Sequence, residues 1–284
     1  FTKMHGLGND FVVLDLRGEA TAASALGPAV AEAIADRRTG VGCDQLIVLE
    51  TVPAGETDGA EAFMRIRNAD GGEVDACGNA TRCIGALLMA ETGRETAVIR
   101  TAADLLTVTR ATDALVTVDM GEPRFGWGDI PLAVETNTLH LDLSRGPLSG
   151  PAAASMGNPH LTFFVDDAET APIEVVGPEL EVDPIFPERA NIAVAQIVAP
   201  DRMRLRVWER GAGLTPACGT GACAAVANAS RRELGNRRMT VETDGGLLDI
   251  DWRDDGRIYM TGPAVTSYTG VLDASLMAGW TLPA

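Results

Sequence analysis

The segment ACGNATRCIG, residues 76 to 85, places a cysteine directly before a glycine at a predicted helix start. Apolar residues recur at helical spacing from Asn79 to Leu88, so we expect the helix to begin beside Cys77. The first backbone N–H groups of a helix have no intrahelical acceptor, and the helix dipole favours an anion at this end. We therefore expect the helix start to lower the pKa of the Cys77 thiol.

A second cysteine motif, ACGTGACAAV at residues 217 to 226, places Cys218 141 positions after Cys77. The same offset pairs MRIRNADGG (64–72) with LRVWERGAG (205–213), so each cysteine follows a predicted strand and a glycine-containing turn. Repetition over this distance indicates a duplicated fold.

Further repeats lie on either side of the two cysteine motifs. GNDFVVLD (8–15) resembles GNPHLTFFVD (157–166), and VDMGEP (118–123) resembles YMTGP (259–263). These repeats predict two halves of similar fold with small insertions between them, and a boundary near residues 120 to 125.

Each half is predicted to be rich in strands around one long helix. LLTVTR (105–110) and ALVTVD (114–119) alternate as strands do. The segment TGACAAVANASRRE (220–233) is small and apolar on nearly every side, so we expect sheet around this helix. An earlier helix is expected near residues 24 to 38. The fold class is therefore α/β.

Composition and charge favour a small-molecule ligand. The chain has 284 residues, 46% of them hydrophobic, and a formal net charge of −17. This charge argues against a nucleic acid or an anionic membrane as a partner, because both would repel an acidic protein. No apolar run reaches the roughly 18 residues of a membrane span, and no leader pattern opens the chain. We expect a cytoplasmic protein.

The cysteine and lysine counts restrict the chemistry further. Five cysteines are an odd number in a chain of this length, so unpaired thiols are expected; Cys43, Cys83 and Cys223 are interpreted as buried hydrophobic residues. Lys3 is the only lysine, and its terminal position makes a pyridoxal phosphate Schiff base improbable. The three histidines show no metal-ligand spacing, so no metal and no cofactor are expected.

Two thiols at matching helix starts suit one reaction in particular. In a pseudo-symmetric pair of domains, the two helix starts can face each other across a cleft. Inverting a stereocentre by proton transfer requires a base on one face of the carbon and an acid on the other. A thiolate and a thiol fulfil both roles. Backbone N–H groups of Gly78-Asn79 and Gly219-Thr220 would hold the reacting carboxylate.

Taken together, the motifs resemble those of the diaminopimelate epimerases, which interconvert LL- and meso-diaminopimelate without pyridoxal phosphate for lysine and peptidoglycan synthesis. The motifs that carry the resemblance run almost end to end: KMHGLGNDF (3–11), GVGCDQ (40–45), NADGGEVDACGNATRC (68–83), GNPH (157–160), FPERANI (186–192) and WERGAGLTPACGTGACA (208–224). Together they are far more specific than either cysteine motif.

The resemblance implies a role for each matching residue. Cys77 and Cys218 would be the catalytic acid/base pair, and His160 and Glu209 would tune the thiol pKa values. The residues expected to bind substrate are Asn9, Gln45, Asn68, Gly78, Asn79, Asn158, Asn191, Glu209, Arg210, Gly219 and Thr220. Glu209-Arg210 also suits a second amino-acid end, since a carboxylate binds an ammonium and an arginine binds a carboxylate.

The family fold implies two similar α/β domains, each with antiparallel strands around a central helix, and an active site between them. It places residues 264–284 with the first domain, which gives predicted domains of 1–122 plus 264–284 and of 123–263. Homodimers also occur in the family. This chain reads ACGNATRC where the family commonly reads MCGNGARC, so Ala80 replaces a glycine; we expect Ala80 to stiffen the helix start.

Other functions stay open at this stage. A proline or hydroxyproline racemase of the same fold would also use two cysteines, but carries histidine in CGHG where this chain has CGNA, and has little need of Glu209-Arg210. A catalytically silent amino-acid-binding protein would not require both thiols. A thiol redox protein usually shows a C-x-x-C spacing, which this chain lacks.

Overall fold

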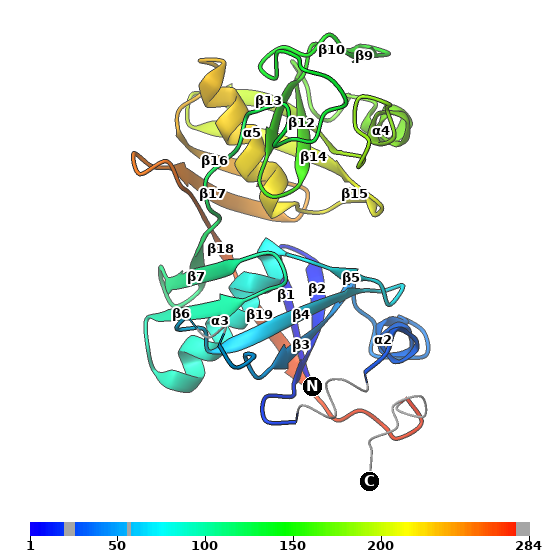
Figure 1. Cartoon of the computed structure of the whole chain (residues 1–284), viewed down its shortest axis with the longest axis vertical. Helices are drawn as coiled ribbons and strands as arrows, with labels where there is room; N and C mark the ends of the chain where they lie inside the picture. Colours follow the sequence, from blue (N-terminus) through cyan, green and yellow to red (C-terminus); the bar gives the residue numbers. More distant parts are fainter. Residues whose placement is uncertain (20–25, 56–57, 277–284) are drawn as a thin grey trace. The chain divides into compact units, whose positions relative to one another are not determined.

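The computed structural model describes residues 1–19, 26–55 and 58–276. The chain divides into two compact units (Figure 1). The first unit contains Phe1–Val118 and Pro263–Ala284, and the second contains Asp119–Gly262. The sequence repeats predicted a boundary near residues 120 to 125, and the family resemblance implied a second boundary after residue 263.

In its described residues, the first unit contains a sheet and two helices. Its elements are β1 (Thr2–Gly6), β2 (Asn9–Asp15), α2 (Pro28–Ala35), β3 (Gln45–Glu50), β4 (Ala62–Asn68), β5 (Glu73–Val74), α3 (Gly78–Thr92), β6 (Thr96–Arg100), β7 (Leu105–Arg110), β8 (Leu115–Asp119) and β19 (Val265–Thr269). β2 pairs in parallel with β3, and β4 pairs in parallel with β6; the pairs β1–β2, β3–β4, β4–β5, β6–β7 and β7–β8 are antiparallel. β19 also pairs antiparallel with β1.

The second unit contains β9 (Ser144–Arg145), β10 (Leu148–Ser149), β11 (Ala152–Ser155), β12 (Pro159–Phe164), α4 (Ile173–Glu181), β13 (Asn191–Ala199), β14 (Arg202–Glu209), β15 (Gly213–Thr215), α5 (Gly219–Arg231), β16 (Arg238–Thr243), β17 (Gly246–Trp252) and β18 (Ile258–Pro263). From β11 onward, the second unit repeats the order of β1 to β8, and β9 and β10 form a separate hairpin before β11.

Strand pairing matches between the two units step by step. β12 pairs in parallel with β13 and β14 with β16, whereas β11–β12, β13–β14, β14–β15, β16–β17 and β17–β18 are antiparallel. α2 and α4 occupy the same place in this order, and so do α3 and α5. The predicted α/β class is confirmed, with the long helix of each unit beginning directly after its cysteine.

Both faces of β3 are covered. In β3, Leu46 and Val48 pack against α2, while Ile47 and Leu49 point to the opposite face and are also buried. Within the first unit, α3 contacts β1, β6 and β7. This packing is close, because a Cβ added to Gly85 of α3 would lie 2.3 Å from a methyl carbon of Val108.

The long helix of the second unit is enclosed more completely than that of the first. Ten residues of α5, most of them alanine or glycine, are buried, and the helix contacts β11, β12, β13, β16 and β17. Small side chains let the strand backbones approach it, as in Ala152 and Ala154 of β11, both fully buried. The expectation of a helix surrounded by sheet holds for α5.

Two helices differ from the sequence-based expectation. The helix expected near residues 24–38 is the shorter α2, which begins at Pro28 and ends at Ala35; residues 24 and 25 lie outside the described residues. Asp36 ends this helix, because its carboxylate accepts hydrogen bonds from the backbone N–H groups of Arg38 and Thr39. α4 was not predicted, although it occupies the place of α2 in the second unit.

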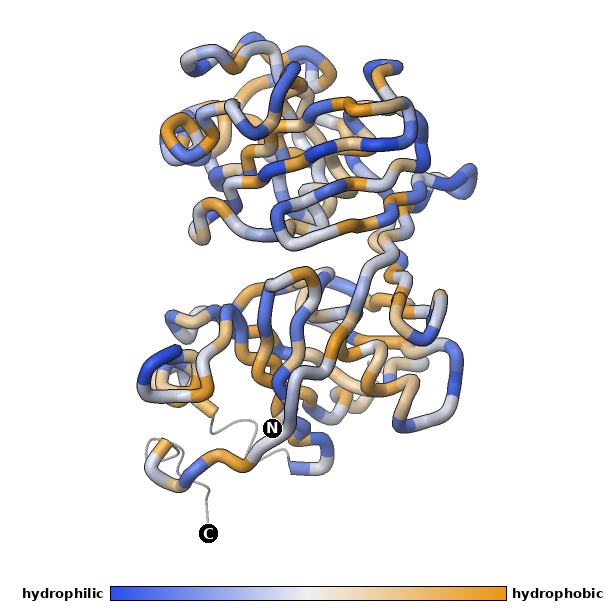
Figure 2. The backbone as a smooth tube through the Cα atoms, turned by 180° about the vertical axis from the view of Figure 1, so that it is seen from behind, coloured by the Kyte–Doolittle hydropathy of each residue, from blue (hydrophilic) through white to orange (hydrophobic). Residues whose placement is uncertain are grey.

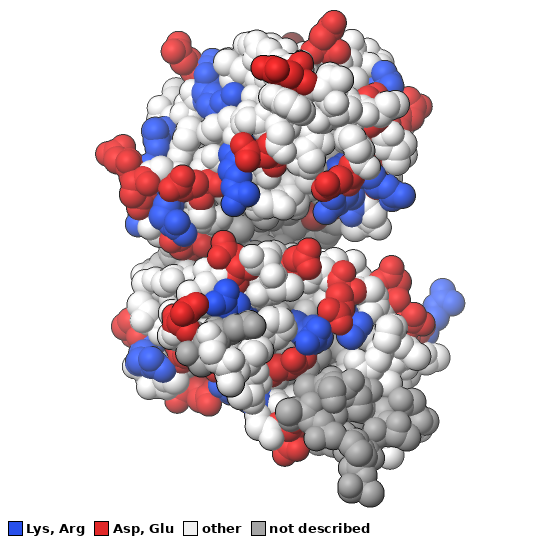
Figure 3. Space-filling view, in the orientation of Figure 1, with Lys and Arg blue, Asp and Glu red and all other residues white. Residues whose placement is uncertain are grey.

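The surfaces of both units are mixed in polarity. Figure 2 shows hydrophilic and hydrophobic residues alternating along several strands, and Figure 3 shows acidic and basic side chains interspersed on the visible face of each unit. Across residues 1–19, 26–55 and 58–276, no helix has both the length and the apolar character needed to cross a membrane.

Candidate active site

Cys77 is the N-cap residue of α3, with an extended backbone at φ −150° and ψ 109°. Its carbonyl oxygen accepts the first bond of the helix from the N–H of Thr81 at 2.9 Å, and the Thr81 hydroxyl donates to the same oxygen at 2.9 Å. The Cys77 side chain is partly exposed, and its Sγ lies 3.8 Å from Oδ1 of Asn9. The thiol therefore sits at the helix start, as the motif predicts.

A chain of hydrogen bonds extends from this thiol into the helix. Asn79 Nδ2 donates to Asn9 Oδ1 at 3.2 Å, and Arg82 Nη2 donates to Asn79 Oδ1 at 2.8 Å. Asn9 Nδ2 donates in turn to Asp44 at 3.0 Å. Since a guanidinium can only donate and a carboxylate only accepts, the orientations of both asparagine amides are fixed from the two ends.

The other two predicted residues of the first unit meet at the ends of neighbouring strands. Gln45 opens β3 and Asn68 closes β4; the two are paired in register, and Gln45 Nε2 donates to Asn68 Oδ1 at 3.0 Å. Nearby, the buried Lys3 ammonium bonds Asp10 at 2.6 Å and the carbonyl of Gly42. Lys3 is thus held in a structural ion pair.

Cys218 occupies the corresponding position in the second unit, as the N-cap of α5 with φ −114° and ψ 111°. Its Sγ accepts a hydrogen bond from the N–H of Gly221 at 3.4 Å and lies 3.6 Å from the Thr220 hydroxyl. Cys218 is only 4% exposed. The two cysteines therefore share a backbone position and differ in their surroundings.

Burial raises the pKa of the Cys218 thiol well above its ordinary value, and the charge of Glu209 raises it further. The hydrogen bonds from Thr220 and Gly221 act in the opposite direction and do not outweigh burial. The helix start was expected to lower the pKa of the Cys77 thiol, whereas at the matching helix start the pKa of Cys218 is raised. The desolvation of a sulfur anion exceeds what the helix start supplies.

His160 lies in β12 and is fully buried. Its Nε2 lies 2.9 Å from Asn158 Oδ1, and Asn158 Nδ2 lies 3.4 Å from the Thr220 hydroxyl, which reaches Cys218. Burial, with a smaller contribution from the charge of Arg210, lowers the pKa of His160 to about 3. His160 is therefore a neutral imidazole at physiological pH.

Asn191 and Arg210, two further predicted residues of the second unit, form hydrogen bonds between side chains and the backbone. Asn191 Oδ1 accepts from the N–H of Arg210 at 2.9 Å, and Asn191 Nδ2 donates to the carbonyl of Pro159 at 3.0 Å. The Arg210 guanidinium is exposed and donates to the carbonyl of Glu188 at 2.8 Å. Glu209 accepts a hydrogen bond from the Thr215 hydroxyl.

The predicted residues thus form one cluster in each unit. In the first unit are Asn9, Gln45, Asn68, Cys77, Gly78 and Asn79. In the second are Asn158, His160, Asn191, Glu209, Arg210, Cys218, Gly219 and Thr220. Gly78 and Gly219 are the first helical residues of α3 and α5, which is where backbone N–H groups lack intrahelical acceptors.

Sequence reasoning did not single out Arg82, Thr215 or Glu181, which contact these clusters. Arg82 is fully buried, and a charged residue inside the small and apolar segment 78–89 was a usable signal. Thr215 and Glu181 carry no such signal, because they reach the site only after the chain has folded.

The other cysteines have surroundings typical of core residues. Burial raises the pKa of Cys43 to about 11 and that of Cys83 to about 12, and Cys223 is fully buried in α5. Within the described part of the chain, no group of three His, Cys, Asp or Glu side chains is placed to hold a metal ion.

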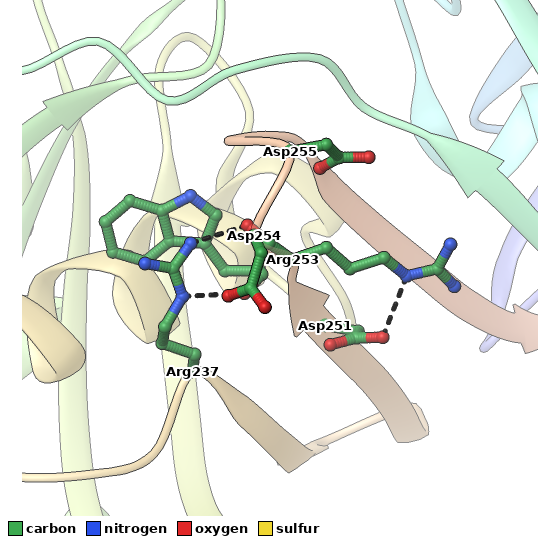
Figure 4. A pocket seen from close by; sticks show the side chains of 6 residues that line it. Arg237, Asp251, Arg253, Asp254 and Asp255 are labelled. Atoms are coloured by element: carbon green, nitrogen blue, oxygen red, sulfur yellow. Dashed lines mark hydrogen bonds and ion pairs between the residues drawn. The ribbon is translucent and has the colours of Figure 1, made fainter.

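An open depression of about 490 Å³ lies in the second unit and contains none of the predicted site residues. The Arg237 guanidinium lies over the indole of Trp252, 4.1 Å from the ring centre. Arg253 Nε donates to Asp251 at 3.0 Å, and Figure 4 shows this pair. Arg237 also donates to two backbone carbonyls. Both arginines are thus bonded to neighbouring protein groups, so we assign no ligand to this depression.

Known relatives agree with the motifs. A family model described as diaminopimelate epimerase matches residues 1–126 and 152–267. The chain is 58% identical to a diaminopimelate epimerase of Acidiphilium cryptum over 98% of each chain, and 51% identical to one of Rhodospirillum centenum over 98% of this chain and 94% of the relative. The chain belongs to the diaminopimelate epimerase family. The resemblance inferred from the motifs is confirmed.

Solved structures of lower identity share the fold. A hydroxyproline epimerase from Agrobacterium vitis matches with a TM-score of 0.66 at 14% identity, over 98% of this chain and 94% of that one. A phenazine biosynthesis protein from Clostridium difficile matches with a TM-score of 0.65 at 15% identity, over 96% and 98%. The fold is therefore common to family members and to more distant proteins.

Proposed function

We propose that this chain interconverts LL- and meso-2,6-diaminopimelate, with Cys77 and Cys218 as the two proton-transfer groups. One observation carries the proposal beyond family membership: the two cysteines are N-caps of the matching helices α3 and α5 in units of the same topology. A stereocentre inverted by proton transfer needs two groups of this kind, one for each face.

In this mechanism one cysteine reacts as a thiolate and takes the α-proton, and the other gives a proton to the opposite face. The S–H bond of the second thiol breaks as the new C–H bond forms, so each turnover exchanges the protonation states of the pair. The raised pKa of Cys218 favours Cys218 as the protonated member before substrate binds.

The α-carbon loses its proton only if the negative charge developing on the carboxylate is stabilised. The starts of α3 and α5 supply backbone N–H groups at Gly78, Asn79, Gly219 and Thr220. Each preorganised donor of this type is worth about 3 kcal/mol in the transition state. No lysine Schiff base is required, which agrees with the structural ion pair of Lys3.

The far end of the substrate would be bound mainly by polar residues at strand ends. Glu209 would bind the distal ammonium and Arg210 the distal carboxylate, with Asn68, Asn158 and Asn191 completing the hydrogen bonds. The exposed guanidinium of Arg210 supports this assignment, and its backbone N–H is held by Asn191 Oδ1 at 2.9 Å. A substrate with a single amino-acid end would leave these groups unused.

Proton NMR of LL-diaminopimelate with reduced protein in D2O tests the proposal. We expect loss of the α-proton signal together with formation of the meso isomer, and loss of that conversion in both Cys77→Ala and Cys218→Ala. Cys223→Ala is the matched control, because it removes a buried thiol from α5 and leaves the helix start intact.

The same assay separates the alternatives. Exchange with proline and none with diaminopimelate would assign a racemase of proline type. Binding of diaminopimelate without any proton exchange would identify a silent binding protein and contradict the proposal. Conversion that survives either cysteine substitution would refute the two-thiol mechanism.

A further inference from the structure

Glu181 is a buried carboxylate that the motifs did not identify. It is the last residue of α4 and is 7% exposed. A carboxylate is rarely buried unless its oxygens are bonded. Glu181 Oε2 accepts from the indole Nε1 of Trp208 at 2.8 Å, and Oε1 accepts from the backbone N–H of Gly211 at 3.0 Å. The Arg189 guanidinium lies 3.6 Å from Oε1.

These contacts fall on the segments that carry the substrate-binding residues. Gly211 directly follows Glu209-Arg210, and Trp208 directly precedes that pair. The backbone carbonyl of Glu181 accepts from the N–H of Ala190 at 3.1 Å, one residue before Asn191. Both segments are therefore fastened to the end of the same helix.

The packing of α4 explains why the indole reaches this carboxylate. A Cβ added to Gly177 would lie 2.7 Å from Cγ of Trp208, so only a glycine lets the indole lie this close to the helix. Gly177 lies four residues before Glu181 and thus on the same helix face. The indole N–H is directed to the carboxylate at the helix end.

We propose that Glu181 is a positioning residue for recognition of the distal end of the substrate. Its carboxylate fixes the turn after β14 and thereby the places of Glu209 and Arg210, while its carbonyl fixes the segment leading to Asn191. The inference rests on the function proposed above, since it concerns the same residues. Glu181 acts through the side chain of Trp208 and the backbone of Gly211, to which its two oxygens are bonded.

The chemistry of the site distinguishes a carboxylate from its isosteric amide. Trp208 and Gly211 both present N–H donors, so both oxygens of residue 181 must accept. In Glu181→Gln, the amide nitrogen must face one of these donors. That variant loses one hydrogen bond and places the glutamine N–H against the N–H of Trp208 or Gly211. The volume of the side chain is nearly unchanged.

Two readouts test the role. We expect Glu181→Gln to raise KM for diaminopimelate about tenfold with kcat within about twofold, the loss of one bond to a charged acceptor. In the free protein, hydrogen exchange of the Gly211 amide should become about tenfold faster. Glu179→Gln is the matched control: it removes a charge from the same helix, but its side chain is 66% exposed. Both readouts should stay at wild-type values.

A second substitution tests the donor arrangement directly. Trp208→Phe removes the indole N–H, so a glutamine at position 181 can turn its nitrogen toward residue 208 and accept from Gly211. In the double variant Glu181→Gln/Trp208→Phe, the exchange rate of the Gly211 amide should lie within about threefold of its rate in Trp208→Phe alone.

Several outcomes would overturn the inference. A wild-type KM in Glu181→Gln, or an equal change in Glu179→Gln, would show that this carboxylate does not position the turn. The inference would also fail if adding Trp208→Phe to Glu181→Gln did not restore the protection of the Gly211 amide from exchange. The exchange measurement uses no substrate, so it tests the positioning of the turn independently of the proposed function. Its result remains valid even if the protein acts on another amino acid.

Discussion

The two cysteine sites share one backbone plan and differ in the charges placed on it. Cys77 corresponds to Cys218, Asn9 to Asn158, Gln45 to Asn191 and Asn68 to Glu209, by sequence offset and by strand order. In the first unit the strand-end partners are neutral amides. In the second, Glu209 and the buried imidazole of His160 take part.

In the two long helices the difference in charge is reversed, because here the first unit carries the charged residue. Five residues after Cys77, α3 carries the buried guanidinium of Arg82; five residues after Cys218, α5 carries the neutral Cys223. A duplicated fold thus supplies equal positions for two thiols, and the side chains make the positions unequal. In the proposed mechanism the two thiols hold one proton between them, and such inequality decides which member carries it.

The largest expected effect is on the free energy of unfolding, and it distinguishes Arg82 from the corresponding residue Cys223. Arg82→Met should lower the free energy of unfolding by about 3 kcal/mol, because the Asn79 and Pro263 oxygens lose their buried donor. Cys223→Ala should lower it by about 1 kcal/mol, since only a small apolar group is lost. Urea denaturation measures both. Equal losses would show that the guanidinium is no special feature of α3.

A second difference concerns acid stability. His160 corresponds to Phe11 in the first unit, and its folded pKa of about 3 lies below the ordinary 6.5. The unfolded chain therefore binds the proton first as pH falls below 6.5, and stability is lost. Between pH 7 and pH 5, the wild type should lose about 2 kcal/mol more of unfolding free energy than His160→Gln.

Parallel pH profiles of the wild type and His160→Gln in urea denaturation would contradict this assignment of a buried neutral imidazole. Phe11→Leu, a change at the corresponding position without a titrating group, is the control. Its profile should parallel that of the wild type.

The smallest effect concerns Glu209. Its charge raises the pKa of Cys218, so Glu209→Gln should speed alkylation of Cys218 by iodoacetamide about threefold near neutral pH, with Cys77 unchanged. Asn68→Glu, the reciprocal change, should slow alkylation of Cys77. Peptide mass spectrometry at timed intervals measures both rates. Slower alkylation of Cys218 in Glu209→Gln would refute the assigned effect of the carboxylate.

Local chemistry made much of the fold predictable. β7 begins and ends where alternation in LLTVTR predicts, and both long helices start at their cysteines, as the two cysteine motifs predict. α4 escaped prediction because Gly177 and Pro178 lie inside it, and both are poor helix formers. Contacts with a buried cluster of β12 and β13 residues stabilise it nonetheless.

Sequence by itself determined the family, the division into two similar halves and the position of each thiol at a helix start, because short motifs that recur along the chain carry these features. Tertiary structure decided the raised pKa of the Cys218 thiol. The burial of Cys218 and its neighbour Glu209 arise from strands and turns that meet only on folding. For the same reason only the folded chain reveals Glu181, whose two oxygens bind residues 27 and 30 positions away. Desolvation and hydrogen bonding act through space, and a linear pattern does not record them.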